Sequence, residues 1–468
     1  MKEMDKKQSR RTFIAKSAML ASGLSVGVPY VSSARHKIIG ANEKIRLGFI
    51  GVGNRGSKLL NLFMQNKDVE IAALCDVYKP YTERDRGLVA DRYLEIGKVP
   101  KMGEEFPNRI QKFTDFRKML EMKDLDAVCI ATPDHWHAIQ TIQSIEAGLD
   151  VYVEKPLTIT INEGRAMVNA QKNSKQVVAV GLNRRGSSVY SKLHKVIQDG
   201  GVGKVTTARA MRISNMAPNG IGNLKAEQPP KDFDWDMWLG PRAERAYQYN
   251  IAPYFFRWWE DYSSQMGNWG VHFMDVIRWM LDETAPKAIT AHGGKYVLTD
   301  DRTIPDTMEV LFEFESGRIV QFSIHEASAG KGIPNGEIEL RGTKGTVYAS
   351  QNGYKIQPSW PGQFQKWDDR IEPQEVSVES MEQFGDLNIK EDTTANLVNN
   401  FIDCIKTRET PLCTLEDGHR STSFAHLANI ALKMGTRIEW DAENERITNI
   451  EKANDLLHYE YRKPWKLA

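Results

Sequence analysis

Three glycines, Gly51, Gly53 and Gly56, have the spacing that points most directly to chemistry in this chain. They follow an apolar run at residues 45–50 and precede residues 57–63, whose pattern predicts a helix. In such a turn the glycines permit a sharp reversal, a close approach to a pyrophosphate, and tight helix–strand packing. The helix N-terminus adds unpaired N–H groups. The turn predicts a dinucleotide site, and its remaining residues, Asn54 and Arg55, belong to the same predicted cofactor loop.

A carboxylate strengthens this interpretation, because a G-x-G-x-x-G turn alone is weak support. A second apolar run, residues 69–75, ends at Asp76, about 20 residues past the last glycine. A carboxylate there accepts a hydrogen bond from a ribose 2′-OH and repels a 2′-phosphate, so we expect NAD rather than NADP. Lys79 and Arg84 lie nearby and weaken that preference, since either can turn toward a phosphate.

Lys155 lies in a second segment suited to chemistry, Val153-Glu154-Lys155-Pro156, at the end of a strand predicted over residues 150–153. Ligands bind at the carboxyl ends of strands in open α/β sheets. An ammonium there can hydrogen-bond an alcohol during oxidation and favour its developing alkoxide, with Glu154 paired to the ammonium. The alternative is a lysine held in a surface salt bridge.

Two histidines, His135 and His137, follow another predicted strand (residues 125–131) and the pair Thr132-Pro133. An H-x-H pattern without a carboxylate or cysteine companion is weak as a zinc site. We therefore expect no metal.

The segment of residues 267–275 contains His272, the best candidate for proton transfer, and Asp275, which lies three residues later and near the same helical face. Asp275 could orient the imidazole, whereas the alternative is that His272 only caps or packs. A histidine base near its ordinary pKa predicts a rate that rises through roughly pH 6 to 7.

An aromatic run at residues 254–262 includes Arg257 and Trp258. Aromatic faces stack on sugar rings, and arginine and carboxylate groups bind hydroxyls, so we expect carbohydrate contacts here. Each tryptophan is equally well explained as a core residue.

The elements that must position these residues change character along the chain. Strand and helix patterns alternate from residue 44 to about 180, which predicts a doubly wound parallel sheet of the Rossmann type. Later strands, at residues 205–213, 288–297, 307–314, 319–325, 338–341 and 346–349, have few helices between them. They predict an α+β domain with a large, mostly antiparallel sheet, followed by helices at 393–406 and 415–434. Residues 215–232 and 352–390 are predicted loops.

Length and composition fit two domains and exclude other classes. The chain has 468 residues and a net charge of +1 with mixed signs, so nucleic-acid binding is not expected. No apolar stretch reaches the ~20 residues that span a bilayer. We divide the chain into a signal segment with linker (1–40), a NAD-binding domain (41–181), a substrate and oligomerisation domain (182–440) and a tail (441–468).

The first 40 residues predict export. Arg10 and Arg11 precede a short apolar stretch of small residues and a cleavage-like Ser32-Ser33-Ala34, which resembles a twin-arginine signal. We expect a periplasmic protein that begins near Arg35. No cysteine precedes Cys75, so no lipid anchor is expected, and the alternatives are an ordinary secretory signal or a basic tail.

The four motifs together resemble the glucose–fructose oxidoreductase / inositol dehydrogenase (Gfo/Idh/MocA) family. The resemblance rests on the glycine turn, Ala131-Thr132-Pro133-Asp134-His135-Trp136-His137, Glu154-Lys155-Pro156, and Gly267-Asn268-Trp269-Gly270-Val271-His272. It implies a catalytic or orienting role for Lys155, proton transfer at His272, and cofactor contacts for Thr132, Pro133, His137 and Glu154. Many members have an aspartate where this chain has Asn268. The resemblance further implies substrate contacts at Arg185, Asn268 and His272.

The family resemblance leaves three functions open. The favoured one is NAD(H)-dependent oxidation of a hydroxyl on a sugar, glycoside or polyol. The second is an NAD-retaining glycoside hydrolase that works by transient C3 oxidation and elimination, and the third is a non-catalytic sugar sensor. The resemblance also implies a homo-oligomer formed through the sheet of the second domain.

Overall fold

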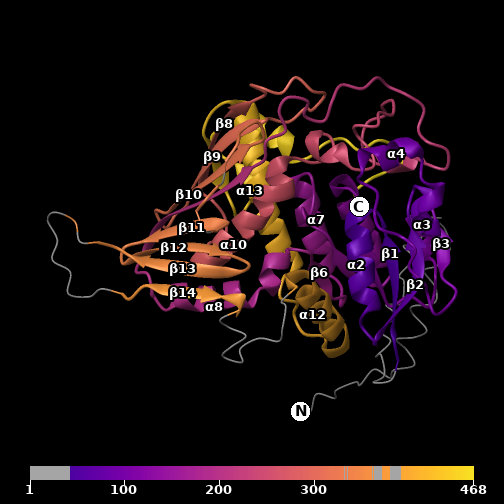
Figure 1. Cartoon of the computed structure of the whole chain (residues 1–468), viewed down its shortest axis with the longest axis horizontal. Helices are drawn as coiled ribbons and strands as arrows, with labels where there is room; N and C mark the ends of the chain where they lie inside the picture. Colours follow the sequence, from indigo (N-terminus) through magenta and orange to yellow (C-terminus); the bar gives the residue numbers. More distant parts are fainter. Residues whose placement is uncertain are drawn as a thin grey trace, which may run out of the picture. The chain divides into compact units, whose positions relative to one another are not determined.

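The computed structural model describes residues 43–330, 332–334, 336–360, 362, 371–379 and 392–467. The predicted export signal in residues 1–40 lies outside this part of the chain. All described residues belong to one compact unit, Arg35–Ala468. Figure 1 shows its two sheets, the first coloured indigo to purple and the second mainly orange.

The first sheet has six parallel strands in the order β3-β2-β1-β4-β5-β6. The strands are β1 (Ile45–Ile50), β2 (Val69–Cys75), β3 (Gln111–Phe113), β4 (Ala127–Ile130), β5 (Asp150–Val153) and β6 (Val178–Val180). Their central members are apolar and buried on both faces, as parallel strands require. Chain order reverses between β1 and β4, and ligands bind at such a switch point.

Helices cover both faces of this sheet. They are α2 (Asn54–Met64), α3 (Lys79–Glu83), α4 (Asp91–Ile96), α5 (Phe116–Leu120), α6 (His137–Glu146) and α7 (Ile161–Lys172), with short 3-10 turns η1 (Arg86–Leu88) and η2 (Asp134–Trp136). One face packs against α2, and the other packs against α5, α6 and α7.

The second sheet has ten strands in the order β14-β13-β12-β11-β7-β10-β9-β8-β15-β16. They are β7 (Val205–Ile213), β8 (Ala288–Gly294), β9 (Thr307–Glu313), β10 (Ile319–His325), β11 (Ile338–Gly342), β12 (Gly345–Ser350), β13 (Gly353–Pro358), β14 (Gln374–Ser377), β15 (Ile438–Asp441) and β16 (Arg446–Ile447). Its pairs are antiparallel except for β7 with β10, which confirms the predicted fold class.

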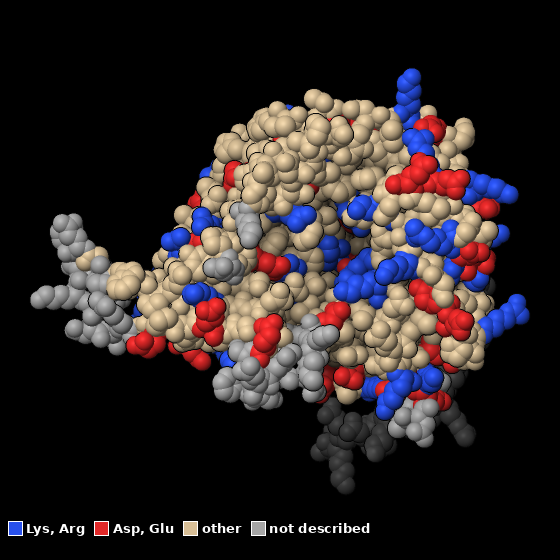
Figure 2. All heavy atoms as spheres, viewed as in Figure 1, with Lys and Arg blue, Asp and Glu red and all other residues tan. Residues whose placement is uncertain are grey.

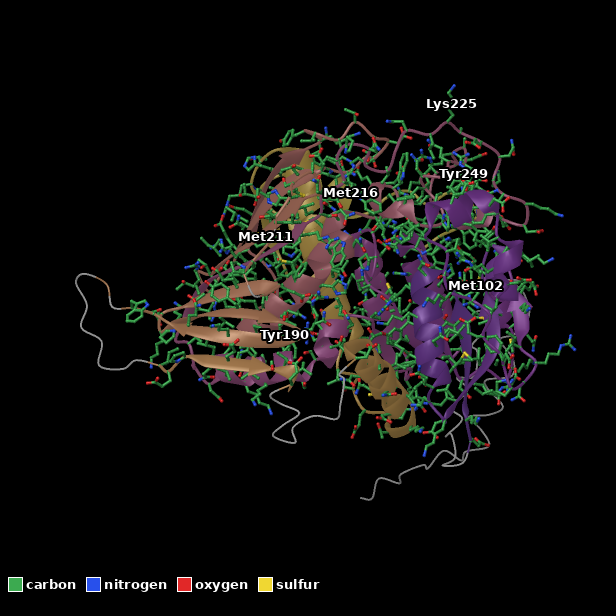
Figure 3. The ribbon with its side chains drawn as sticks, viewed as in Figure 1. Met102, Tyr190, Met211, Met216, Lys225 and Tyr249 are labelled. Atoms are coloured by element: carbon green, nitrogen blue, oxygen red, sulfur yellow. The ribbon has the colours of Figure 1, made fainter. Side chains whose placement is uncertain are left out.

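Three long helices fill the space behind the second sheet and form its core. The helices of this part of the chain are α8 (Ser188–Gln198), α9 (Trp235–Leu239), α10 (Val271–Leu281), α12 (Thr393–Thr407) and α13 (Leu415–Met434), with short turns η3 (Asn183–Gly186), η4 (Phe255–Trp258), η5 (Met266–Gly270) and η6 (Glu451–Leu457). Residues of α8, α10 and α13 pack against the sheet, among them Tyr190 of α8, which Figure 3 labels. The helix α12 instead packs on the first sheet, where Phe401 contacts Phe63 and Tyr152 with ring centroids 6.3 and 5.7 Å apart.

The predicted strands at 205–213 and 319–325 and the helix at 415–434 have the predicted bounds. Three details differ from expectation. The short run Phe113-Thr114-Asp115 predicts the third strand, but β3 spans Gln111–Phe113. The helices α8 and α10 were not predicted, and the predicted loop at 352–390 contains β13 and β14. In β13, Tyr354 and Ile356 are buried and alternate with half-buried or exposed residues, a pattern that its glycine and proline ends conceal.

Among the described residues, no helix is both long and apolar enough to cross a lipid bilayer.

Candidate active site

The glycine turn between β1 and α2 has the predicted geometry. Gly51 has φ +85°, and a Cβ on it would lie 2.9 Å from the backbone of Ala131. A Cβ on Gly56 would lie 2.1 Å from the carbonyl oxygen of Gly51, so only glycine lets α2 pack this closely. A Cβ on Gly53 would have only the Tyr81 ring in contact, at 3.7 Å. Gly53 therefore faces open space, which the phosphates of a dinucleotide can enter.

The N-terminus of α2 fits an anion. Gly53 is its N-cap and offers no side-chain acceptor, and the first turn has no acidic residue. The first N–H groups are thus left for a ligand, and the helix dipole favours negative charge there. Asn54 closes one side by donating to the carbonyl of Lys98 at 2.7 Å. These features fit a diphosphate.

Asp76 follows β2 at the same edge of the sheet. Its carboxylate accepts hydrogen bonds from the backbone N–H groups of Val52 (2.9 Å) and Tyr78 (3.0 Å). Burial raises its pKa to about 6, against the opposing effect of these bonds. Arg84 does not point to the place where a ribose would meet Asp76. Its guanidinium is buried and is bonded to Glu104, Ser57 and the carbonyl of Val52.

A cleft connects the glycine turn with the second part of the chain, which begins after β6. It is lined from the first part by Gly51, Gly53, Asn54, Arg55, Asp76, Thr132, Pro133, Asp134, Glu154 and Lys155, and from the second part by Phe233, Met237, Trp238, Tyr254, Phe256, Arg257 and Asn268. On the face drawn in Figure 2, Lys and Arg atoms gather in the central hollow.

Lys155 extends from the end of β5 across the cleft. Its Nζ donates to the backbone oxygen of Asn268 at 2.8 Å and lies 3.3 Å from the Asn268 side-chain oxygen. Burial lowers the pKa of Lys155 to about 8, although the charges of Glu154 and Asp134 oppose the shift. The ammonium can thus lose its proton near neutral pH. Its peptide bond to Pro156 is cis.

Glu154 does not pair with this ammonium, contrary to the prediction. Its Oε1 accepts from Nε of Arg55 at 2.6 Å, and a Cβ on Gly181 would collide with it. The pair ties α2 to the end of β5, so Glu154 and Arg55 fix the geometry of the cofactor side.

His272, in the first turn of α10, has a buried Nδ1 that lacks a hydrogen-bond partner. Burial lowers its pKa well below the usual range, and the positive charges of Arg184, Lys155 and Arg55 lower it further. The imidazole is therefore neutral, which removes the reason for a rate increase through pH 6 to 7.

Three sequence models of one family match the chain in succession. They are described as an oxidoreductase family with a NAD-binding Rossmann fold (residues 45–182), a GFO/IDH/MocA C-terminal domain (190–348) and an oxidoreductase C-terminal alpha/beta domain (361–467). The chain belongs to the Gfo/Idh/MocA family of oxidoreductases. Its first domain is therefore a NAD-binding Rossmann domain, as the glycine turn predicted.

Curated relatives within the family match part of the chain. An alpha-N-acetylgalactosaminidase from Shewanella oneidensis is 32% identical over 146 residues, which cover 30% of each chain. A glycosyl hydrolase family 109 protein from Saccharopolyspora erythraea is 29% identical over 210 residues, 42% of this chain and 44% of that protein. The chain thus matches less than half the length of these relatives.

Solved structures share the fold over most of the chain. Levoglucosan dehydrogenase in complex with NADH and L-sorbose superposes with a TM-score of 0.61 at 17% identity, covering 85% of this chain and 99% of that one. The WlbA dehydrogenase from Bordetella pertussis, in complex with NADH and UDP-GlcNAcA, gives 0.60 at 19% identity, covering 86% and 99%. Both likenesses establish the fold of this Gfo/Idh/MocA protein.

Two predicted substrate residues of this family member have other partners. Arg185 donates two bonds of 2.9 Å to Asp275, which is fully buried and also accepts from Ser421. Asp275 therefore holds Arg185 and does not orient His272. The indole N–H of Trp258 donates to Glu326 at 2.9 Å, and Trp258 is not part of the cleft lining.

Arg257 does line the cleft. Its guanidinium lies 4.5 Å from the ring centre of Tyr254 and 4.4 Å from that of Phe256, and one nitrogen donates to the Tyr254 carbonyl at 2.6 Å. Burial lowers its pKa.

Both histidines of the loop after β4 have structural roles. The ring nitrogens of His137 lie 2.8 Å from the carbonyl of Pro156 and 2.9 Å from that of Thr132, so His137 joins the two cleft loops. His135 contacts the carbonyl of Trp238 at 2.9 Å. No group of three potential metal-ligating side chains occurs in the described part of the chain.

Asp134 is a cleft residue that the sequence analysis missed. It is 6% exposed, bonds to the hydroxyl of Ser263, and has a pKa raised by burial. Its position directly after Thr132-Pro133, inside the motif of residues 131–137, was the available signal.

Proposed function

We propose that this protein transfers hydride between NAD(H) and a hydroxyl-bearing carbon of a sugar, glycoside or polyol. The observation that carries the proposal is Lys155. It is a buried amine with a pKa of about 8, held by Asn268, in the cleft that the NAD-binding turn opens into. NAD supplies the hydride acceptor when bound.

The chain's own residues account for the proton. Neutral Lys155 takes the hydroxyl proton, and its position is fixed by the backbone oxygen of Asn268. His272 stays neutral; its Nδ1 is buried without a hydrogen-bond partner, and the residue is not part of the cleft lining. Gly51, Gly53, Asn54, Arg55, Gly56 and Asp76 hold the dinucleotide, and Thr132, Pro133 and His137 shape the adjoining loop.

The test is to purify the protein, identify the retained nucleotide by mass spectrometry, and screen sugars, glycosides and polyols. Formation of NADH together with a ketone supports the proposal. A complete panel without either product contradicts it.

A second candidate is a glycoside hydrolase that keeps NAD bound. It is favoured by the match to a relative named alpha-N-acetylgalactosaminidase and to glycosyl hydrolase family 109 proteins. Transient oxidation at C3, elimination, water addition and re-reduction would cleave the glycoside without net NADH. Release of the aglycone with no NADH accumulation identifies this alternative.

We further propose that the protein is exported to the periplasm by a twin-arginine signal and matures near Arg35. The support is the Arg10-Arg11 pair before a short apolar stretch. With Arg10→Lys and Arg11→Lys combined, unprocessed precursor should accumulate in the cytosol. Normal export of that variant contradicts the proposal.

We also propose a homo-oligomer formed through the outer face of the second sheet. Leu311 of β9 and Ile319 of β10 are large apolar side chains exposed on neighbouring strands, at 45% and 43%. Light scattering after size exclusion should give a multiple of the monomer mass, and Leu311→Lys should reduce it. A monomer at micromolar concentration contradicts this proposal.

A further inference from the structure

The wall of the cleft contains an arginine, Arg257, that no carboxylate neutralises in a salt bridge. Elsewhere in this part of the chain, arginines have acidic partners: Arg184 pairs with Glu337 at 2.7 Å and Arg302 with Glu326 at 2.8 Å. Among the described residues, Arg257 has no carboxylate in salt-bridge range and lies over aromatic rings instead.

Two cations lie against Tyr254, which lines the cleft. Arg257 lies over its ring at 4.5 Å, and Nζ of Lys98 lies 5.3 Å from the same ring centre. Arg212 does not line the cleft: it lies 3.9 Å from the ring of Trp269 and interacts electrostatically with Glu326 and Tyr254. Arg257 is therefore the arginine of this group that can reach a ligand in the cleft.

The local charge balance is positive. Glu154 pairs with Arg55, and Glu326 is bonded to Arg302 and Trp258 and also interacts with Arg212. The carboxylate that remains near Lys155 and Arg257 is Asp134, which burial drives toward its neutral form. Lys155 and Arg257 thus lie in a buried part of the cleft wall, of low dielectric constant, where positive charge exceeds negative charge.

The diphosphate of NAD does not explain Arg257. It fits the turn Gly51–Gly56 and the N-terminus of α2, where Lys98 and Asn54 lie. The charge of Arg257 instead acts on Lys155, at the reacting end of the cleft. A negative group that neutralises Arg257 would therefore be carried by the substrate and not by the cofactor.

We propose that the substrate is a sugar carrying an anionic oxygen group, a carboxylate or a sulfate ester, which Arg257 binds. This inference rests on the proposed function, because it names the substrate class of the same site. A guanidinium presents a planar fork that matches such groups through paired hydrogen bonds.

The first experiment compares matched ligands on the NADH-loaded protein. Calorimetry is run with methyl β-D-glucuronide against methyl β-D-glucoside, with the galacto pair, and with glucose 6-sulfate. We expect at least one acidic ligand to bind about 10- to 100-fold more tightly than its neutral counterpart, the range for hydrogen bonds to a charged group. A preference for the uronide or for the sulfate separates the two anionic groups. Equal or weaker binding of every acidic ligand overturns the inference.

This binding measurement is independent of turnover. If neutral sugars are oxidised and acidic ones neither bind nor react, the inference fails while the proposed function stands. If acidic sugars bind selectively but no ligand yields ketone, NADH or aglycone, the proposed function fails while the anion site stands.

The second experiment uses variants. Arg257→Gln should raise KM for the acidic substrate about 10- to 100-fold, and Arg257→Lys should recover part of this loss. The affinity for NADH should stay within about twofold. Arg245→Gln is the matched control, because Arg245 also lies over an aromatic ring, Trp259 at 4.4 Å, but outside the cleft lining. A loss of NADH affinity equal to the loss for the acidic ligand would assign Arg257 to the diphosphate and overturn the inference.

Discussion

Arginines of two kinds in the second part of the chain differ in what surrounds them. Near the start of α13, Arg185 bonds to Asp275 at 2.9 Å and Arg278 to Asp417 at 2.8 Å. The crossed contacts, Arg185 to Asp417 and Arg278 to Asp275, are 3.4 and 3.8 Å, and Ser421 donates to Asp275. The network joins η3, α10 and α13. In the cleft, Arg257 lies on aromatic rings and has no carboxylate in salt-bridge range. The first kind is neutralised and holds helices together, whereas Arg257 is the arginine that we assign to a ligand.

The difference teaches that burial alone does not assign a role to an arginine. The side chain of Arg185 is 10% exposed and that of its partner Asp275 is 1% exposed. Removing either side chain therefore leaves the charge of the other buried and unpaired. Arg257 has no carboxylate partner that would be left unpaired if Arg257 were replaced. Stability and ligand affinity should therefore separate the two kinds of arginine, and the following experiments test that separation.

The largest effect is expected for the stability of Arg185→Gln. The change leaves the Asp275 carboxylate buried without its bidentate partner, and unpairing a buried ion pair costs about 3–5 kcal/mol. Arg257→Gln should cost less than about 1 kcal/mol, as for a residue outside such a network. Urea denaturation of both variants measures the free energies of unfolding. Equal losses in the free energy of unfolding for the two variants would show that Arg185 and Arg257 do not differ in this way.

Next in size is the effect of Lys155→Met on catalysis. Hydride transfer should fall by about a hundredfold or more, because the group that handles the hydroxyl proton is lost. NAD affinity should persist, since the glycine turn holds the pyrophosphate independently. Single-turnover kinetics and a fluorescence titration with NADH measure the two quantities. Oxidation at a near wild-type rate would reduce Lys155 to a hydrogen-bonded structural residue.

The pH dependence should report Lys155 rather than His272. Because burial lowers the pKa of Lys155 to about 8, its neutral form increases as the pH rises through that value. The oxidation rate should therefore rise through about pH 8 and level off above it. His272 is already neutral in this range, so His272→Ala should lower the rate without moving the inflection. An inflection between pH 6 and 7 that disappears in His272→Ala would show that His272, and not Lys155, accepts the proton.

The smallest effect is expected for Asn268→Ala. The stronger bond to Lys155 comes from the backbone oxygen of residue 268, at 2.8 Å, and survives the substitution. Only the side-chain contact at 3.3 Å is lost, so KM should rise a few-fold and kcat should change less. Steady-state kinetics beside His272→Ala provide the check. Matching losses in kcat for both variants would give the amide a catalytic role.

Local features of the sequence were sufficient for the cofactor side of the site. The roles of Gly51 and Gly56 follow from backbone sterics within one turn, and Lys155 is placed by the strand that ends before it. The fold class follows from apolar patterning in the same way. These properties depend on neighbouring residues, so the sequence predicted them.

The substrate side depends on residues far apart in the chain. Whether Arg185 meets a ligand or a carboxylate is decided by Asp275, 90 residues later, and Trp258 meets Glu326 after 68 residues. No local pattern distinguishes Arg185 from Arg257. The low pKa of His272 likewise comes from burial and from cations on three other segments.

The packing of α12 has a consequence for how the chain folds. Phe401 completes the apolar face formed by Phe63 and Tyr152, and Lys406 and Arg408 pair with Asp68 and Asp150. These contacts span about 250 to 340 residues, so the parallel sheet carries a high contact order, which slows folding. A fragment of residues 43–181 alone would leave this face uncovered and prone to aggregate. The apolar face of the dinucleotide-binding half is thus completed by a helix that follows β14 and most strands of the second sheet in the chain.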